Sequence, residues 1–342
     1  IPVDPHDEMD LGVELMVAQR LPLSARLARE RDRARALGES ARAMTDAALL
    51  DVEREAALLS CAAWEADALK RVRTRHVEVL RTMAEIARAQ IASGRATVGD
   101  AQRVDAEVVR LTIDVVESEG ERAAIDAETN ALLGRAPDAP LAAPSERVPL
   151  LAPAPVAVDV TTRDEVRASA ALLAASDAER ARAADAWIPD LTAKVGWSSM
   201  WPVTHQLMLG VAVDLPVFNG GRSAEQDSAS LMREGASSAL DDVKLRAVAE
   251  LAAARARDQA AATMRALFED QVVPLVAARA ETARAALSGG AALDAALDAT
   301  HEERAAQIEL LRATAAQCRS RADHWRATGL SFLTNAPSAE LP

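Results

Sequence analysis

The sequence contains no tyrosine, and aromatic residues make up only 2% of the chain. Half of the 342 residues count as hydrophobic, but alanine alone accounts for just over a fifth of the chain. A wide aromatic core is therefore excluded, and so much alanine favours helices whose backbones approach closely. The length would usually correspond to about two ordinary domains, although an elongated helical protein escapes that rule.

Clustered basic residues are also lacking. The chain has 39 Lys and Arg against 52 Asp and Glu, which gives a formal net charge of -13. Attraction to nucleic-acid phosphates needs Lys and Arg gathered in a patch, and no such block is present. Nucleic acid is therefore excluded as a partner.

Cysteine and histidine are too sparse to indicate a chemical site. The two cysteines, Cys61 and Cys318, form neither a disulfide framework nor a metal motif, and each is expected to be a small buried hydrophobic residue. His301-Glu302 lacks the second histidine that a zinc-binding helix requires. The sequence therefore predicts no catalytic residue, no metal site and no cofactor, and it favours a protein that is not an enzyme.

Long apolar runs are missing as well, since none approaches the roughly 20 residues of a membrane helix. No signal peptide is visible, but the chain opens at Ile1 without a methionine. We therefore interpret it as a mature or trimmed product.

Proline is absent from residues 24–136, and six prolines then fall within residues 137–155, which predicts an extended linker. Residues 24–92 would form one helix of about 70 residues, on the order of 100 Å long. Residues 222–288 would form a helix of nearly the same length. Each ends at a glycine break, Gly94 or Gly289-Gly290, and a return helix of roughly 35 residues is expected after it.

Apolar residues in these segments recur at alternating steps of three and four, the spacing of a coiled coil. This pattern predicts two hairpins of long antiparallel helices, with His76 as a packing residue rather than a ligand. The expected packing positions are Leu69, Val72, His76, Val79, Met83 and Ile86 in the first long helix, Val104, Val108, Leu111 and Val115 in its return helix, and Ile308, Leu311, Ala315 and Cys318 in the second return helix.

Three short segments have the length and composition of strands, namely residues 11–20, 190–200 and 205–217. A helix is expected over residues 163–186, before the second strand. Three tryptophans, Trp187, Trp197 and Trp201, lie on or beside the last two strands. They form either the core of a small sheet or an aromatic girdle at a membrane surface, and the sequence leaves both open.

The chain carries an internal repeat. Leu21-Pro-Leu23 recurs as Leu215-Pro-Val217, Arg88 as Arg284, and Ser93-Gly94 as Ser288-Gly289, with offsets of 194 to 196 residues. Residues 1–136 are interpreted as a partial first repeat, 137–160 as the linker and 161–335 as the second repeat. Since the first repeat shows one strand and the second shows two, we expect a further strand upstream of Ile1.

These features together resemble the TolC-like outer-membrane efflux channels. The resemblance lies in Trp187-Ile-Pro-Asp-Leu191, Leu215-Pro-Val-Phe-Asn-Gly-Gly-Arg222, Leu132-Leu-Gly134, Pro274, and the glycine breaks followed by Asp100 and Asp298. Gln19-Arg-Leu-Pro-Leu-Ser-Ala-Arg26 is similar to the heavy-metal efflux branch. The departures are the missing first helix and strand, the absent tyrosines and a poorly apolar first strand.

The resemblance implies a mainly α fold with a small β portion, in which three chains build one twelve-stranded outer-membrane barrel and a helical tunnel through the periplasm. It implies a passive duct of a tripartite efflux pump in a Gram-negative bacterium. Its partners would be two further copies of the chain, a periplasmic adaptor protein, an inner-membrane transporter and outer-membrane lipid.

The resemblance also assigns candidate sites. The glycine breaks would form the adaptor-docking tip, although glycine there also simply turns the chain. Asp294 and Asp298 lie one helical turn apart and would form a ring of carboxylates in the pore, or else remain solvated surface acids. The candidate docking residues are Ser93, Gly94, Arg95, Ser288, Gly289 and Gly290.

A second interpretation is a soluble structural protein whose long helices act as a spacer or scaffold. The strand pair in residues 187–217 discriminates between the two, because a duct needs an apolar outward face there and a scaffold does not.

Overall fold

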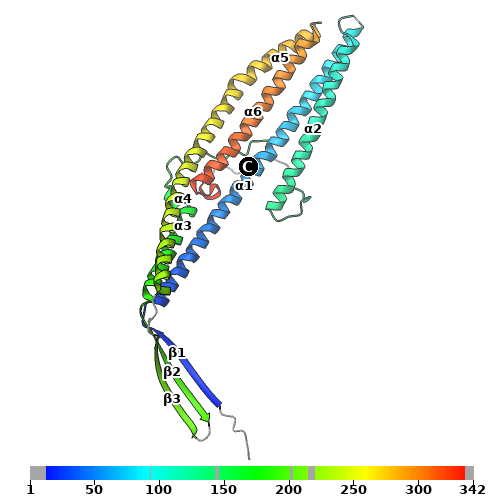
Figure 1. The fold of residues 1–342 in the computed structure, drawn as a ribbon. Helices are drawn as coiled ribbons and strands as arrows, with labels where there is room; N and C mark the ends of the chain where they lie inside the picture. The colour runs from blue at the N-terminus through cyan, green and yellow to red at the C-terminus, as the bar shows by residue number, and fades with distance from the viewer. Residues whose placement is uncertain (1–12, 93, 143–145, 201–202, 215–219, 336–342) are drawn as a thin grey trace, which may run out of the picture. The chain divides into compact units, whose positions relative to one another are not determined.

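A computed structural model describes residues 13–92, 94–142, 146–200, 203–214 and 220–335 (Figure 1). The chain divides into two compact units: residues 1–45 with 164–244, and residues 46–163 with 245–342. Each unit draws on both predicted repeats, so the compact units do not follow the repeat boundaries; the division into repeats stays an interpretation.

Long helices dominate the structure, as predicted, and the two return helices have 35 and 36 residues. The longest, α1, runs for 66 residues without interruption. The helices are α1 (Arg26–Ile91), α2 (Val98–Leu132), α3 (Asp164–Asp185), α4 (Gly220–Leu267), α5 (Val273–Ser288), α6 (Leu293–Thr328) and the short α7 (Phe332–Asn335).

The second long helix differs from the expected continuous rod. A π-helical turn over Phe268–Val272 separates α4 from α5, and Val273 donates its N–H to the carbonyl of Phe268, five residues earlier. Pro274 accounts for the wider turn, because proline has no N–H to donate and its ring crowds the carbonyl four residues before it.

The first unit contains a three-stranded antiparallel sheet in the order β1-β2-β3. Its strands are β1 (Val13–Pro22), β2 (Asp190–Met200) and β3 (Val203–Asp214). The three predicted strands are therefore confirmed, with shifted ends. The first two residues predicted for the first strand and the last three predicted for the third strand lie outside the described residues.

Three helical segments accompany the sheet in this unit and are held to one another by ion pairs. Arg182 on α3 contacts Glu179 at 2.7 Å and Glu225 on α4 at 2.5 Å, while Arg33 on α1 lies 3.4 Å from Glu179. The hydrogen bond from Arg182 holds the pKa of the Glu179 carboxyl below its ordinary value.

In the second unit, α1 and α6 lie between α2 and α5 (Figure 1). The helices share an apolar core whose members belong to α1, α2, α5 and α6. Its buried residues are Val77, Leu80, Met83, Ala84, Ala87, Ala101, Val104, Leu111, Leu287, Leu293, Ala296 and Leu297. The predicted packing positions Val79, Ile86, Val108 and Val115 lie against this core, which confirms the coiled-coil spacing.

The prediction for the cysteines was wrong in one respect. Both side chains are buried as expected, but Cys61 on α1 and Cys318 on α6 form a disulfide with a Cα–Cα distance of 5.9 Å. The sequence separation of 257 residues concealed the pairing, since nothing in a linear sequence shows that these two helices lie side by side.

The proline-rich linker is fixed along the helices by side chains that donate to its carbonyls. Asn130 at the end of α2 donates to Ala139 (2.8 Å), Trp64 to Glu146 (3.3 Å), Arg321 to Leu151 (3.0 Å) and Trp325 to Ala152 (2.7 Å). We call residues 146–152 the strap. Proline-rich backbone is suited to this role, because its carbonyls remain free to accept hydrogen bonds.

A buried polar cluster lies beside the strap. Asp258 on α4 accepts hydrogen bonds from Arg321 at 3.0 and 3.1 Å and lies 3.1 Å from His324 Nδ1. All three residues are buried, so the cluster meets the rule that buried charge is paired.

His76 on α1 is a packing residue, as predicted. It is 3% exposed, and its Nε2 lies 3.2 Å from Oε1 of Gln307 on α6. Burial lowers the pKa of this imidazole, outweighing the Gln307 hydrogen bond and the Glu303 charge, which act in the opposite direction.

The histidine should therefore make stability depend on pH. The unfolded chain takes up a proton near the ordinary pKa of 6.5, whereas folded His76 resists protonation, so the free energy of unfolding should fall as pH drops below about 6.5. Chemical denaturation at several pH values measures this slope. His76→Gln should flatten it, while Gln307→Ala, which retains the imidazole, should keep it; equal slopes in wild type and His76→Gln would contradict the assignment.

Candidate functional site

One face of the sheet is mainly apolar, and the other carries the charged side chains. The register aligns Leu15, Trp197 and Leu207 across the three strands, and it aligns Val17, Val195 and Leu209 beside them. The apolar members of the first face are Val13, Leu15, Val17 and Leu21 on β1, Leu191, Ala193, Val195 and Trp197 on β2, and Leu207, Leu209, Val211 and Val213 on β3; Gln19 and Ser199 also lie on this face.

This apolar face is exposed in the chain. Leu207, Leu209 and Val211 have 70%, 76% and 70% of their surface accessible, and Leu15 has 61%. The opposite face is mixed: it carries the polar side chains Glu14, Arg20, Asp190, Thr192, Lys194, Ser198 and Gln206, together with Met16, Ala18, Met208 and Ala212. A contiguous exposed apolar patch of this kind marks a surface that contacts another molecule or a membrane.

The tryptophans beside the sheet are not its core. Trp197 on the apolar face is 39% exposed, and Trp187, just after α3, is 38% exposed. Trp201 lies outside the described residues. Since an indole buried in a sheet core would be almost inaccessible, the two described tryptophans favour a surface role.

The two helical hairpins turn through equivalent glycine motifs. Gly94 and Gly290 adopt left-handed backbone conformations with φ of 71° and 99°. The following residues close the turn, since Arg95 donates to the carbonyl of Gln90 and Ala291 to that of Ala286, each at 3.1 Å. Both bonds span five residues, so the structural counterpart of Gly94 is Gly290, whereas the repeat alignment had paired it with Gly289.

The two turns contact each other. A Cβ added to Gly290 would lie 2.7 Å from the Arg95 guanidinium, which could move aside, so glycine is needed there for its backbone conformation. Gly289 has φ of -78°, which any residue adopts. Ser288 donates its hydroxyl to the carbonyl of Ala285, and Ser93 lies outside the described residues.

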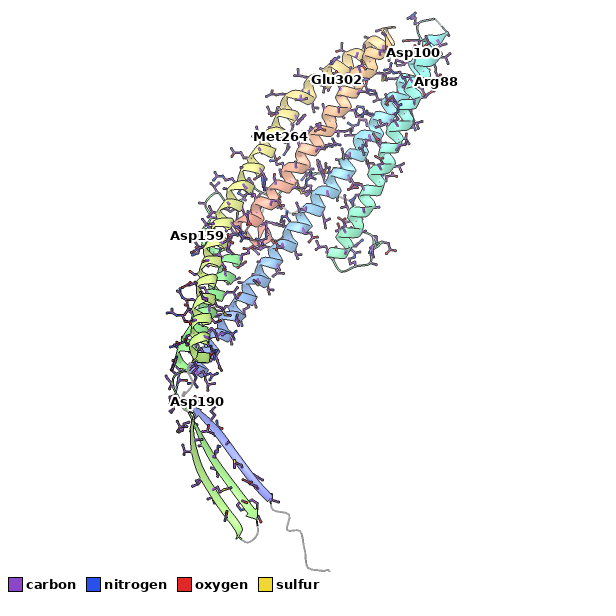
Figure 2. All side chains as sticks on the ribbon, viewed as in Figure 1. Arg88, Asp100, Asp159, Asp190, Met264 and Glu302 are labelled. Atoms are coloured by element: carbon purple, nitrogen blue, oxygen red, sulfur yellow. A yellow bond between two sulfur atoms is a disulfide. The ribbon has the colours of Figure 1, made fainter. Side chains whose placement is uncertain are left out.

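The helices that follow the two turns begin differently. Thr97 and Asp100 form a reciprocal capping box at the start of α2, and Figure 2 labels Asp100 near this end of the hairpin. Hydrogen bonds from Thr97 hold the pKa of the Asp100 carboxyl below its ordinary value. At the start of α6, by contrast, Ala292 offers no side-chain cap.

The two candidate pore acids have different surroundings in the structure. Asp294 on α6 forms an ion pair with Arg103 on α2, with 2.6 Å between Oδ1 and the guanidinium nitrogen. Asp298 is exposed and has no ion pair within the described part of the chain. The sequence could not distinguish them, because the contact between α2 and α6 joins residues 191 apart.

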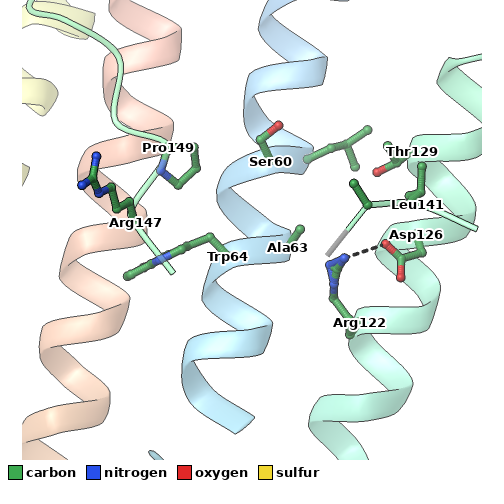
Figure 3. A pocket seen from close by; sticks show the side chains of 11 residues that line it. Ser60, Ala63, Trp64, Arg122, Asp126, Thr129, Leu141, Arg147 and Pro149 are labelled. Carbon is green, nitrogen blue, oxygen red and sulfur yellow. Dashed lines mark ion pairs between the residues drawn. The ribbon is translucent and has the colours of Figure 1, made fainter. Parts of the chain in front are cut away.

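A pocket of about 340 Å³ lies between α1, α2 and the linker (Figure 3). Arg122 within it contacts Asp126 at 3.0 Å and Asp67 at 3.5 Å, so its charge is already compensated. The other lining side chains shown include Ser60, Ala63, Trp64, Thr129, Leu141, Arg147 and Pro149. The arrangement offers neither a nucleophile beside a base nor a pair of acids, and so it indicates no reaction.

Across the described residues, no group of three or more His, Cys, Asp or Glu side chains is arranged to hold a metal ion. Among the described helices, none has the length and apolar content needed to cross a membrane.

Comparison with known proteins identifies the class of fold. No protein-family profile and no curated sequence matches the chain, but solved structures do. The outer-membrane channel OprN superposes with a TM-score of 0.81 at 19% identity, over 93% of this chain and 74% of that one. CusC, described in terms of transmembrane channel formation, gives 0.83 at 17% identity over 93% and 77%, and the outer-membrane protein VceC from Vibrio cholerae gives 0.82 at 19% over 94% and 80%.

The chain therefore has the fold of the outer-membrane channel proteins. More particularly, it has the TolC-like architecture that the sequence predicted, with long helical hairpins and a small sheet. The neighbours are channels rather than enzymes.

Proposed function

We propose that this protein is the outer-membrane component of a tripartite efflux pump, forming a passive duct that crosses the outer membrane and the periplasm. The observation that carries the proposal is the two-faced sheet: its mainly apolar side is exposed across all three strands, while the charged side chains of the sheet lie on the other side. Strands of 10, 11 and 12 residues suit a tilted membrane crossing, which needs about 9–11.

The same sheet supports assembly into a homotrimer. Its outer strands, β1 and β3, have unpaired backbone groups along their free edges, and hydrocarbon offers these groups no hydrogen-bond partner. A barrel shared by three copies satisfies both edges, in the twelve-stranded arrangement that the resemblance implies. The helices would continue as the periplasmic conduit, on the order of 100 Å long for α1 at 1.5 Å per residue.

The alternative, a soluble helical spacer or scaffold, is less well supported. Leu209 and Val211 are at least 70% exposed on the sheet face. In a spacer surrounded by water, such an apolar face would cause aggregation. Trp187 and Trp197 would lie at the membrane surface, where an indole is favoured.

A charge on the apolar face should block membrane insertion. Leu209→Arg would place a guanidinium in the lipid at a cost of roughly 2–4 kcal/mol per chain near the bilayer centre. Thr192→Arg puts the same side chain on the polar face and should be tolerated. Outer-membrane fractionation of the full-length protein and conductance in planar bilayers measure the outcome, and equal insertion of both variants would favour the scaffold.

The two acids on α6 should contribute unequally to ion selectivity. Asp298 has a free carboxylate in the single chain, whereas Arg103 neutralises Asp294, so Asp298→Asn should reduce cation selectivity more than Asp294→Asn. Arg103→Ala should raise it by exposing the Asp294 charge. Reversal potentials of single channels under a salt gradient report the change; unaltered selectivity in all three variants would show that these acids lie outside the conduction path.

The glycine turns are the proposed docking surface for a periplasmic adaptor, which in turn would link the duct to an inner-membrane transporter. Gly289 is the informative position, because its φ is one that any residue adopts, although a Cβ there would lie 3.3 Å from the Ala286 carbonyl oxygen. Replacing Gly94 instead forces a left-handed conformation that costs roughly 1–2 kcal/mol. Gly289→Leu should therefore reduce adaptor crosslinking while lowering the thermal midpoint less than Gly94→Leu does. Ala136→Leu, beyond the other end of α2, serves as the matched control, and undiminished crosslinking of Gly289→Leu would remove this face from the interface.

A further inference from the structure

The disulfide joins α1 and α6 beside a small apolar cluster of Trp64, Ala68 and Ala315. Several of the buried side chains on these two helices are alanines, including Ala68, Ala315 and Ala322, and the large buried ones are Trp64 and Trp325. Alanine buries little apolar area, so each contact contributes little to holding the helices together. The remaining contacts along this stretch are partly exposed ion pairs, such as Arg54–Asp323 and Arg319–Glu65, which contribute little individually.

The two sulfurs are closed off from solvent. Cys61 is 1% exposed and Cys318 is not exposed at all. The strap supplies part of this cover, because the Pro149 carbonyl oxygen lies 3.3 Å from Cys318 Sγ. Since a bonded sulfur carries no proton, this is a packing contact rather than a hydrogen bond.

Three side chains hold the strap in this position. Trp64, one turn along α1 from Cys61, donates to Glu146, while Arg321 and Trp325, on the same helix as Cys318, donate to Leu151 and Ala152. Val148 packs against Trp64 in a small apolar cluster. The strap therefore lies over the disulfide and is fixed on both sides of it.

We propose that the strap shields this disulfide from thiols, and that the bond must therefore form before the strap docks on the helices. We call the shielded disulfide between α1 and α6 the clasp. Formation transfers two electrons and two protons from the thiols to the disulfide of a thiol–disulfide oxidoreductase, which is itself reduced to a dithiol. The enzyme first forms a mixed disulfide with one of the two cysteines, and the other cysteine then displaces the enzyme, so at least one sulfur must be reachable; the docked strap and the burial of both sulfurs deny that access. The clasp does not depend on channel activity.

The rate of reduction tests the clasp. A dithiol reagent attacks one sulfur as its thiolate, forms a mixed disulfide, releases a cysteine thiolate and resolves by its own second thiol. In the native full-length chain this attack requires local opening of the strap, so reduction should be roughly a hundredfold or more slower than in chain unfolded by guanidinium chloride. Alkylation followed by mass spectrometry counts the freed thiols.

Two matched substitutions test the strap itself. Trp64→Phe with Trp325→Phe removes both indole donors but keeps aromatic bulk, and it should speed reduction about tenfold or more by loosening the strap. Trp187→Phe with Trp197→Phe makes the same chemical change elsewhere and should leave the rate unaltered. Circular dichroism confirms that each variant keeps its helices.

Two results would overturn the proposal. Native and unfolded chain reduced at similar rates would show that the sulfurs are open to solvent. Identical rates in the two tryptophan pairs would show that the strap is not the barrier. The first comparison uses wild type alone, so it remains decisive even if the Trp64→Phe/Trp325→Phe variant fails to fold.

Discussion

Close approach of long helices through small side chains is the constraint on which the structure depends. In the second unit α1 and α6 bury Ala68, Ala315 and Ala322, together with Trp64 and Trp325, while most of the larger aliphatic side chains gather in the apolar core made with α2 and α5. Small side chains permit the close approach but provide little burial energy. The disulfide, the strap and the cross-helix ion pairs occur along this weakly packed stretch, where they compensate for the missing apolar area.

The sheet obeys a different constraint. Alternation with a period of two divides each strand between an apolar and a polar face, and the register keeps the apolar residues of all three strands together. A shift of one residue would mix the two faces, so the pairing of Val17 with Val195 and Leu209 defines the surface as a whole. That surface is uncovered within one chain, which is why a function in lipid and an assembly of several copies are supported by the same observation.

The regular elements could be predicted from the sequence because their causes are local. Missing proline and a repeating apolar spacing defined α1, and the glycine breaks defined the turns. The unpredicted features are those that join distant segments: the Cys61–Cys318 bond, the Arg103–Asp294 ion pair and the hydrogen bonds from Trp325 and Arg321 to the strap. None leaves a trace in the local pattern. The π-helical turn was predictable only in part. Pro274 indicated that the helix would be disturbed, but not that it would widen rather than end.

The candidate site residues show the same contrast between what local sequence predicts and what only tertiary contacts reveal. Position along the chain placed Gly94, Gly289 and Gly290 at the hairpin ends, but only the backbone showed that Gly290, not Gly289, adopts the left-handed conformation. Spacing placed Asp294 and Asp298 on one face of a helix, but their different surroundings arise from a neighbouring helix. Sequence reasoning therefore located the turns and the helix face, whereas tertiary contacts showed which of the two acids is paired.

The low identity to the structural neighbours has the same physical origin. At 17–19% identity the fold persists, although no sequence profile matches. The fold constrains whether a position is apolar, polar or turn-forming, through helix length, the position of breaks and the alternation of strand residues. It does not fix which residue of that type is present, so substitutions accumulate within each type. A clasp such as Cys61–Cys318 can then arise in one chain wherever two helices already lie within about 4.4–6.8 Å between Cα atoms, because it needs only two substitutions and no change of fold.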